Sequence, residues 1–284
     1  MAISAFALLS LANLKTHLGI TGSDDDAVLE SAIDRATAMI ESHTGRRFMA
    51  RQWDEWHSVA SPSGTLVLRQ HPVQYVVGAW SGSATAMTVT STVTGDISAT
   101  VAVHPESFGA SEAGVSAPTL RLVRVSSAGT TSSSSLSMVT YPTTPQLVTA
   151  INAVTGFSAT AGVSMRSVQL HPRFGIDLKA VAGVITGANT GMQYTSDTSN
   201  GIICMDGTGF ESGSDGRVII SYYAGYSTAP HDLAQACATL AAGNYYARKS
   251  DPTMASESLG GYSYSRARAL DTIADTLDAW KEIR

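Results

Sequence analysis

The feature that most constrains the fold of this chain is an abrupt change of composition in its middle. Residues 78–213 carry only 12 charged side chains in 136 positions, whereas the other 148 positions carry 29. The same stretch is rich in Ser, Thr, Gly, Ala and Val, and its apolar and polar residues alternate in short runs separated by small-residue turns. This pattern predicts a β-rich domain at 78–213, inserted into a different domain made of residues 1–77 and 214–284.

The first flanking segment shows helical periodicity with clear start and stop signals. A short helix is predicted between Ser10, which is a good N-cap, and Gly19, which favours a left-handed stop. A longer helix is predicted to follow the acidic run 24–26 and to end at Gly45, since negative charge is favoured at a helix N-terminus. Two helices therefore open the chain.

The second flanking segment predicts a strand at 217–223 and then two more helices. Pro230 suits the first turn of a helix, and a last helix is predicted over about 266–283. The apolar residues of that last helix alternate at spacings of three and four, which is typical of packing on another helix; they are Leu270, Ile273, Leu277 and Trp280. The predicted class is α+β, a small four-helix core with a few strands that carries a large β-rich inserted domain.

Further strands are predicted from period-two alternation. They lie at 52–59, 65–69, 73–80, 86–93, 99–103, 119–125 and 135–139. One helix interrupts them, opened by Pro145 and ending before Gly156, and the serine run 132–135 is predicted to be a hairpin tip or loop.

Overall charge argues against tight nucleic-acid binding and favours assembly. The formal charge is −5 and the isoelectric point about 5.8, so the chain lacks the basic footprint that holds nucleic acid by counter-ion release. Charged residues make up 14% of the chain, against roughly 25% in an average soluble domain, and mean hydropathy is +0.06. We expect a protein that covers much of its surface with other subunits.

Compartment signals are few. Cys204 and Cys237 lie far apart in dissimilar contexts, so we interpret them as free thiols in a reducing compartment. The apolar start of the chain lacks the positive region of a signal peptide. No apolar run approaches the roughly 18 residues of a membrane span, so no membrane partner is expected.

No pattern of side chains points to catalysis, a cofactor or a metal. The seven histidines lack a second ligand at zinc spacing, and neither a G-x-S-x-G elbow nor a P-loop occurs. The acidic run 24–26 lacks the alternate ligands of a calcium loop. Arg46, Arg47 and Arg51 form a small basic cluster that could touch phosphate, although a helix C-terminus also explains the first two. We expect no enzyme, no cofactor and no metal.

The two ends of the chain resemble one known family when they are read together. The similarity lies in residues 11–20 (LANLKTHLGI), the acidic run, and the helix that ends in Ser42-His-Thr-Gly-Arg-Arg-Phe48. It continues in the strand 218–223, Gly225-Tyr226, Pro230-His-Asp-Leu233, and Ser256-Glu-Ser-Leu-Gly260 with Tyr262-Ser263. In this order the motifs are similar to the head–tail connector, or head-completion adaptor, proteins of tailed bacteriophages.

The resemblance implies a structural virion protein that forms a homo-oligomeric ring, with twelve subunits expected on a portal. It implies a neck position between the portal and the tail or a tail-terminator or stopper protein, after synthesis in the bacterial host cytoplasm. Double-stranded DNA would pass through the centre with transient, non-specific contact, which suits an acidic chain. The β-rich stretch of 136 residues is a departure, because short members of the family lack it.

The resemblance also suggests which residues contact partners. The last helix is expected to face the portal through Leu270, Ile273, Leu277, Trp280, Lys281 and Arg284. Arg46, Arg47 and Arg51 are candidates for a DNA-channel or subunit contact. The alternative function is a β-rich binding module, for carbohydrate or a host surface, mounted on a helical base; glycan binding would favour it.

Overall fold

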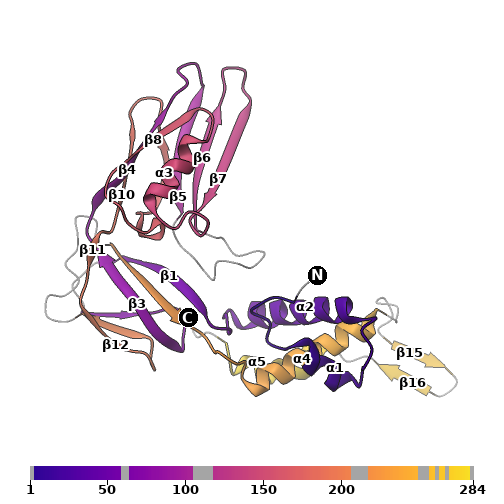
Figure 1. Ribbon diagram of the computed structural model, residues 1–284. Coiled ribbons are helices and arrows are strands. Elements are labelled where there is room, and N and C mark those ends of the chain that lie inside the picture. The colour runs from indigo at the N-terminus through magenta and orange to yellow at the C-terminus, as the bar shows by residue number, and fades with distance from the viewer. Residues whose placement is uncertain are drawn as a thin grey trace. The chain divides into compact units, whose positions relative to one another are not determined.

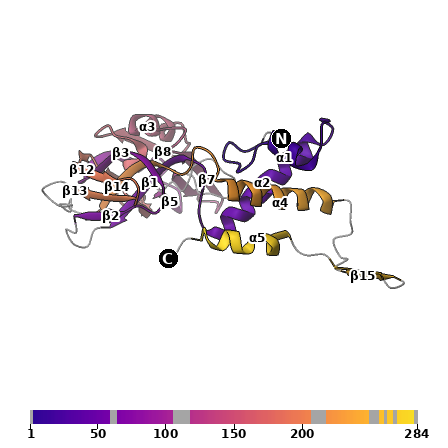
Figure 2. The same cartoon turned by 90° about the horizontal axis from the view of Figure 1, so that it is seen from below.

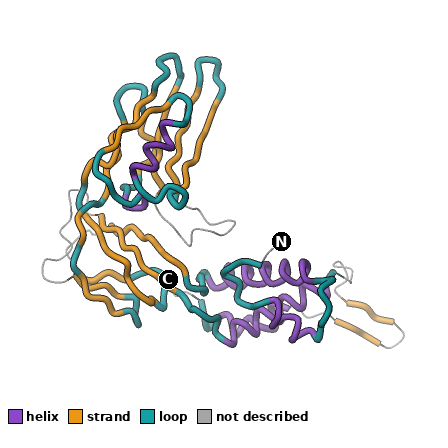
Figure 3. The backbone as a smooth tube through the Cα atoms, viewed as in Figure 1, coloured by secondary structure: helices purple, strands orange, loops and turns teal. Residues whose placement is uncertain are grey.

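A computed structural model describes residues 3–58, 64–104, 118–205, 217–248, 256–259, 262–265 and 269–281. The chain forms two compact units, one made of Met1–Ala50 with Gly225–Arg284 and the other of Arg51–Ala224. The first unit is mainly helical and the second mainly strand (Figures 1 and 3). Helices together with antiparallel sheets confirm the predicted α+β class.

The helical unit contains α1 (Leu11–Leu18), α2 (Asp26–Thr44), α4 (His231–Ala247), α5 (Ala269–Asp278) and a hairpin of β15 (Ser256–Leu259) with β16 (Tyr262–Ser265). Helix α4 packs against both α2 and α5, and the three lie side by side in both views (Figures 1 and 2). Their apolar faces meet in one core. Its fully buried members include Leu14, Leu29, Ile33, Ile40, Leu233 and Leu277.

The ends of the first two helices follow the sequence signals. The Ser10 side chain accepts a hydrogen bond from the Asn13 N–H at 3.2 Å, as an N-cap does. Gly19 and Gly45 end α1 and α2 with φ of +69° and +70°, in the left-handed region that glycine tolerates best. These three predicted helix boundaries are confirmed.

The second unit contains a four-stranded sheet in the order β1–β14–β3–β11. Its strands are β1 (Arg51–Ser58), β14 (Arg217–Ala224), β3 (Val73–Ser81) and β11 (Thr190–Gly191). A smaller sheet pairs β12 (Tyr194–Asp197), β13 (Ile202–Met205) and β2 (Thr65–Val67). Trp53, Ile220 and Tyr222 are buried in the core that these sheets share.

Two further sheets enclose the largest core of this unit. One has the order β7–β6–β5–β9, with β7 (Thr131–Ser137), β6 (Thr119–Val125), β5 (Ser98–His104) and β9 (Arg173–Asp177). The other has the order β10–β4–β8, with β10 (Gly183–Gly187), β4 (Ala84–Ser91) and β8 (Phe157–Ala161), and α3 (Thr144–Asn152) packs on β8. A 3-10 turn, Ser167–Gln169, precedes β9.

The compact units divide the chain at 50/51 and 224/225, whereas the composition placed the boundaries at 77/78 and 213/214. The difference arises because β1 pairs with β14 along its whole length and β14 pairs with β3 on its other side. Backbone pairing therefore holds the strands before residue 78 and after residue 216 in the β-rich unit, whatever their composition. Ser214, at the expected second boundary, lies outside the described residues.

The prediction of a hairpin tip or loop at 132–135 is wrong. These residues lie inside β7, and the turn is 126–130, where the Ser126 N–H donates to the Thr130 carbonyl at 3.0 Å. Gly129 supplies the turn with φ of +78°. Small hydroxyl side chains are compatible with an exposed strand, so the serine run was misinterpreted as a turn signal.

Candidate functional site

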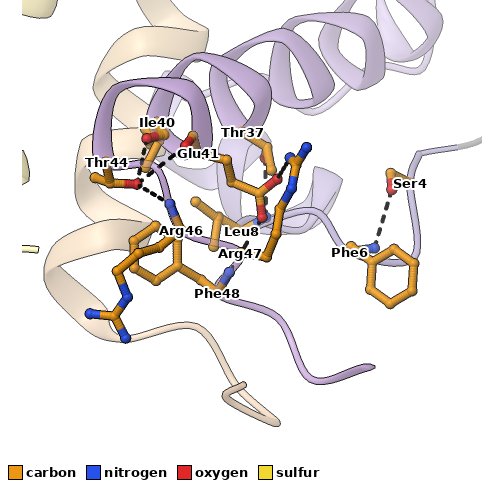
Figure 4. A network of polar contacts seen from close by, with 10 residues as sticks. All are labelled: Ser4, Phe6, Leu8, Thr37, Ile40, Glu41, Thr44, Arg46, Arg47 and Phe48. Carbon is orange, nitrogen blue, oxygen red and sulfur yellow. Dashed lines mark hydrogen bonds and ion pairs between the residues drawn. The ribbon is translucent and has the colours of Figure 1, made fainter. Parts of the chain in front are cut away.

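The C-terminal end of α2 is held by a buried carboxylate. Because Gly45 turns the chain back, Arg47 and Phe48 run beside the last turn of the helix (Figure 4). The Glu41 side chain is 1% exposed and accepts hydrogen bonds from Arg47 Nη1 and, at 3.3 Å, from the Phe48 N–H. A buried carboxylate needs such partners to remain charged. This network positions Phe48 in the helical core.

Hydroxyl groups of α2 hold two neighbouring segments. Thr44 Oγ1 donates to the Ile40 carbonyl at 2.9 Å and accepts from the Arg46 N–H at 3.4 Å (Figure 4). Two turns earlier, Thr37 Oγ1 accepts from the Leu8 N–H at 3.2 Å. The segment before α1 and the segment after α2 are both fixed to the same helix by side chains that are themselves buried.

An aromatic cluster gathers beside this network. The Trp280 ring meets the rings of Phe48 and Tyr226 edge to face, with centroids 5.8 and 5.9 Å apart. Trp280 Nε1 donates to Asp232 Oδ2 at 2.7 Å. The Arg46 guanidinium lies 5.9 Å from the Trp280 ring and 5.5 Å from the Phe48 ring, which are cation–π distances. The indole is therefore ordered by contacts within its own unit.

The proposed portal-facing residues of α5 divide into buried and exposed members. Ile273 and Leu277 are 7% and 0% exposed in the helical core, whereas Trp280 is half-buried and Lys281 is exposed. The side chain of Leu270 and the whole of Arg284 lie outside the described residues. Of the predicted set, only Trp280 and Lys281 present described side-chain surface.

Asp278, at the end of α5, joins two basic groups. Its Oδ1 lies 2.7 Å from Lys281 Nζ and 3.0 Å from His43 Nε2. The hydrogen bond from Lys281, followed by that from His43, lowers the pKa of the Asp278 carboxyl below its ordinary value. This contact links the last turn of α5 to the last turn of α2.

The three arginines of the predicted basic cluster belong to two different compact units. Arg46 and Arg47 belong to the helical unit, where the first lies over aromatic rings and the second pairs with Glu41. Arg51 starts β1 in the other unit and is 3% exposed. Arg46 and Arg47 therefore contact groups of their own unit, and Arg51 is buried in the other.

The β-rich unit contains a buried polar network on one side of β1 and β14. Asp54 accepts a hydrogen bond from Ser221 Oγ and lies 3.4 Å from Arg166 Nη2. Arg166 Nη1 also donates to Ser221 Oγ at 2.9 Å, and its guanidinium lies 5.6 Å from the Trp80 ring. The carboxylate and its partners fasten the 3-10 segment to the paired strands.

A second buried carboxylate lies on the other side of the same strands. Glu55 accepts hydrogen bonds from Tyr222 OH and, at 3.3 Å, from the Arg69 N–H, and its Oε2 is 3.2 Å from His57 Nε2. Burial, and then the Glu55 charge, raise the pKa of the Tyr222 phenol well above its ordinary value. Both carboxylates are enclosed, and their geometry is that of structural networks.

Metal and membrane features are not found among the described residues. Within the described ranges, no group of three or more His, Cys, Asp and Glu side chains is placed to hold a metal ion. None of the helices that the structure describes is long and apolar enough to cross a membrane.

Sequence reasoning missed several residues that build the aromatic cluster. Asp232 lies in the first turn of α4, where a negative charge is favourable in itself, and its carboxylate also holds the Trp280 indole. Phe48 and Tyr226 pack on the same ring. Phe48 follows the Gly45 turn by three residues and Tyr226 directly follows Gly225, but only tertiary structure brings the two rings together.

Comparison with known families identifies the class of protein to which the beginning of the chain is similar. Residues 9–102, about a third of the chain, match a model of phage head-tail connector proteins. The family is described as the phage gp6-like head-tail connector protein family. The match covers α1, α2 and the strands up to the middle of β5. The family resemblance inferred from the sequence motifs is therefore confirmed for this stretch. No curated protein matches the chain.

Three solved structures show similarity over the full length of the chain. The neck of an empty GTA particle, computed with C6 symmetry, is 18% identical, with 100% of this chain and 95% of that chain covered and a TM-score of 0.45. The neck of a native GTA particle, computed with C12 symmetry, is 17% identical, with 100% and 95% covered and a TM-score of 0.42. A virion of a native gene transfer agent is 17% identical, with 100% and 94% covered and a TM-score of 0.41.

Proposed function

We propose that this protein is a structural head–tail connector in the neck of a phage-like particle. The observation that carries the proposal is the connector family match over residues 9–102, which spans the two opening helices. The capping residues on which the sequence resemblance depended form the helix ends in the structure, which supports the match. The protein acts by binding partners rather than by catalysis, and works in the virion after synthesis in the host cytoplasm.

The proposed architecture is a four-helix core that carries an inserted β-rich domain. Support comes from α1, α2, α4 and α5, whose buried residues form one hydrophobic cluster although the helices come from opposite ends of the sequence. The β-rich unit starts and ends on the paired strands β1 and β14, as an inserted domain does. The connector family match covers the two opening helices of this core and continues into the strands up to the middle of β5.

The connector forms a homo-oligomeric ring below the portal, with twelve subunits as the family resemblance implies. A charged fraction of 14% supports extensive contact between subunits, because isolated soluble proteins carry more surface charge. A net charge of −5 suits a conduit for double-stranded DNA, since a strongly basic lining would retain the DNA. Any DNA contact by Arg46 is transient and non-specific.

The portal contact is assigned to the end of α5. Trp280 and Lys281 are the members of the predicted set with described exposed surface, and Asp278 orients Lys281 at 2.7 Å. The buried Ile273 and Leu277 support this surface from within the unit. Tail or stopper proteins bind elsewhere on the ring.

The decisive experiment measures the mass of the purified full-length chain alone and with portal. A closed complex of fixed stoichiometry is the expected result, and a stable monomer that ignores the portal would contradict the proposal. Lys281→Glu should weaken portal binding. Arg35→Glu is the matched control, because it makes the same charge change at an exposed position on α2. Equal effects of the two variants would remove α5 from the interface.

A further inference from the structure

Strand β7 is an exposed edge that lacks the usual protection. It lies at one end of the sheet β7–β6–β5–β9, and all seven of its residues pair with β6 without a shift of register. Its sequence, TSSSSLS, contains no charge and no proline, and most of its side chains are exposed. Proteins commonly blunt edge strands with lysine, proline or bulges, because an open edge accepts another strand.

The hydrogen bonds of the hairpin show which backbone groups face the open edge. The Ser126 N–H donates to the Thr130 carbonyl, and such bonded pairs recur at every second residue of an antiparallel ladder. The N–H and C=O groups of Ser133 and Ser135 therefore point away from β6. In the described part of the chain, no residue bonds to the outward N–H groups of these two serines.

The opposite end of the same sheet is different. Strand β9 is separated from β7 by three antiparallel pairings, so it runs in the direction opposite to β7. Phe174 in β9 is 89% exposed, the largest value among the exposed large hydrophobic side chains of the described residues, and its ring centroid lies 6.2 Å from that of His104 in an edge-to-face arrangement. A bulge at this point, where Gly175 has φ of +55°, blunts the edge at Phe174 and leaves Ile176 and Asp177 in regular register with β5.

We propose that β7 of one subunit pairs with β9 of a second copy of this chain, so that the sheet continues from subunit to subunit. This inference rests on the proposed ring, for which it supplies an interface. Two unlike ends of opposite direction make a head-to-tail contact, the type of contact that closes rings. Because β7 carries no charged side chain, the exposed Phe174 ring of the second copy is the group that we expect to pack against β7.

The test uses full-length protein and measures assembly by native mass against concentration. The double variant Ser133→Pro, Ser135→Pro removes two outward N–H donors and leaves every bond to β6 in place, as proline on an edge strand can. The matched control, Ser133→Ala with Ser135→Ala, keeps both donors. The proline variant should assemble at least about tenfold more weakly than the control.

A second variant acts on the other side of the contact and leaves the subunit core untouched. Phe174→Ser should also weaken assembly, whereas Val181→Ser, at a position 71% exposed, should assemble like the wild type. Normal assembly of the double proline variant would overturn the β7–β9 pairing while leaving the ring intact. So would loss of assembly in the proline variant together with normal assembly of Phe174→Ser. A wild-type chain that stays monomeric even with portal would overturn the ring itself and this interface with it.

Discussion

Replacement of Trp280 by alanine should destabilise the helical unit before any partner is considered. The indole contributes two edge-to-face ring contacts, each worth about 0.5–1.5 kcal/mol beyond burial, and a hydrogen bond to a carboxylate worth about 1.5–3 kcal/mol. A fully buried tryptophan costs about 3–5 kcal/mol on truncation, and Trp280 is only half-buried. We therefore expect Trp280→Ala to lower the free energy of unfolding by about 2–4 kcal/mol.

The assay is thermal and urea unfolding of the unassembled chain, followed by near-ultraviolet circular dichroism. A loss of this size should lower the melting temperature of the helical unit by roughly 10 °C or more. Trp280→Phe keeps an aromatic ring but lacks the donor to Asp232, so it should cost less than the alanine variant. Met39→Ala, at a side chain 40% exposed on α2, is the control that should change little.

The same variant separates a core role from a partner role. Unchanged melting together with lost portal binding would refute the reasoning from packing and assign the side chain to the interface. Reduced melting together with wild-type portal binding would confine Trp280 to the subunit core and leave Lys281 to carry the contact. Because both readouts come from one preparation, the two roles can be compared directly.

Two further predictions concern the interior of each unit. Gly162→Ala should destabilise the β-rich unit by about 1–3 kcal/mol in urea unfolding, because the added Cβ would lie 2.2 Å from the Thr85 carbonyl oxygen. Gly95→Ala is the control and should be neutral, since its added Cβ meets nothing within 4 Å. Burial raises the pKa of the Cys237 thiol to about 11, so a thiol reagent at pH 8 should label Cys204 quickly and Cys237 only on unfolding. The pKa of the thiol in the unfolded chain is lower, about 8.5, so the stability contributed by the neutral Cys237 thiol is complete below that pH and is lost as the pH rises towards 11. Equal labelling of both thiols in the folded state would contradict the burial of Cys237.

Local signals in the sequence predicted the helices well because each boundary depends on one residue. Ser10, Gly19 and Gly45 act through their own side chain or their own φ, so tertiary structure does not need to be known. The long alternating strands were also visible, since burial on one face leaves a period of two. Short strands such as β10 to β13 carry too few residues for a periodic signal.

The site depended on contacts that no local pattern encodes. Trp280 and Asp232 are 48 positions apart, and an acidic residue in a first helical turn already has a sufficient local explanation. The compact units divide the chain at other residues than the composition does, for a related reason. Composition changes at residue 78, but the strand that contains it, β3, is fixed by hydrogen bonds to β14 from the far end of the chain.

The pairing of Arg51 with Ala224 has a consequence for how such a chain can change through evolution. The β-rich unit leaves and rejoins the helical unit through neighbouring positions on adjacent strands, about 5 Å apart. A tight turn of a few residues could therefore replace the whole segment 51–224 and reconnect Ala50 to Gly225. Gain, loss or exchange of the segment is then a single genetic event at one permissive locus. An engineer could use the same position to attach a foreign domain to the helical unit.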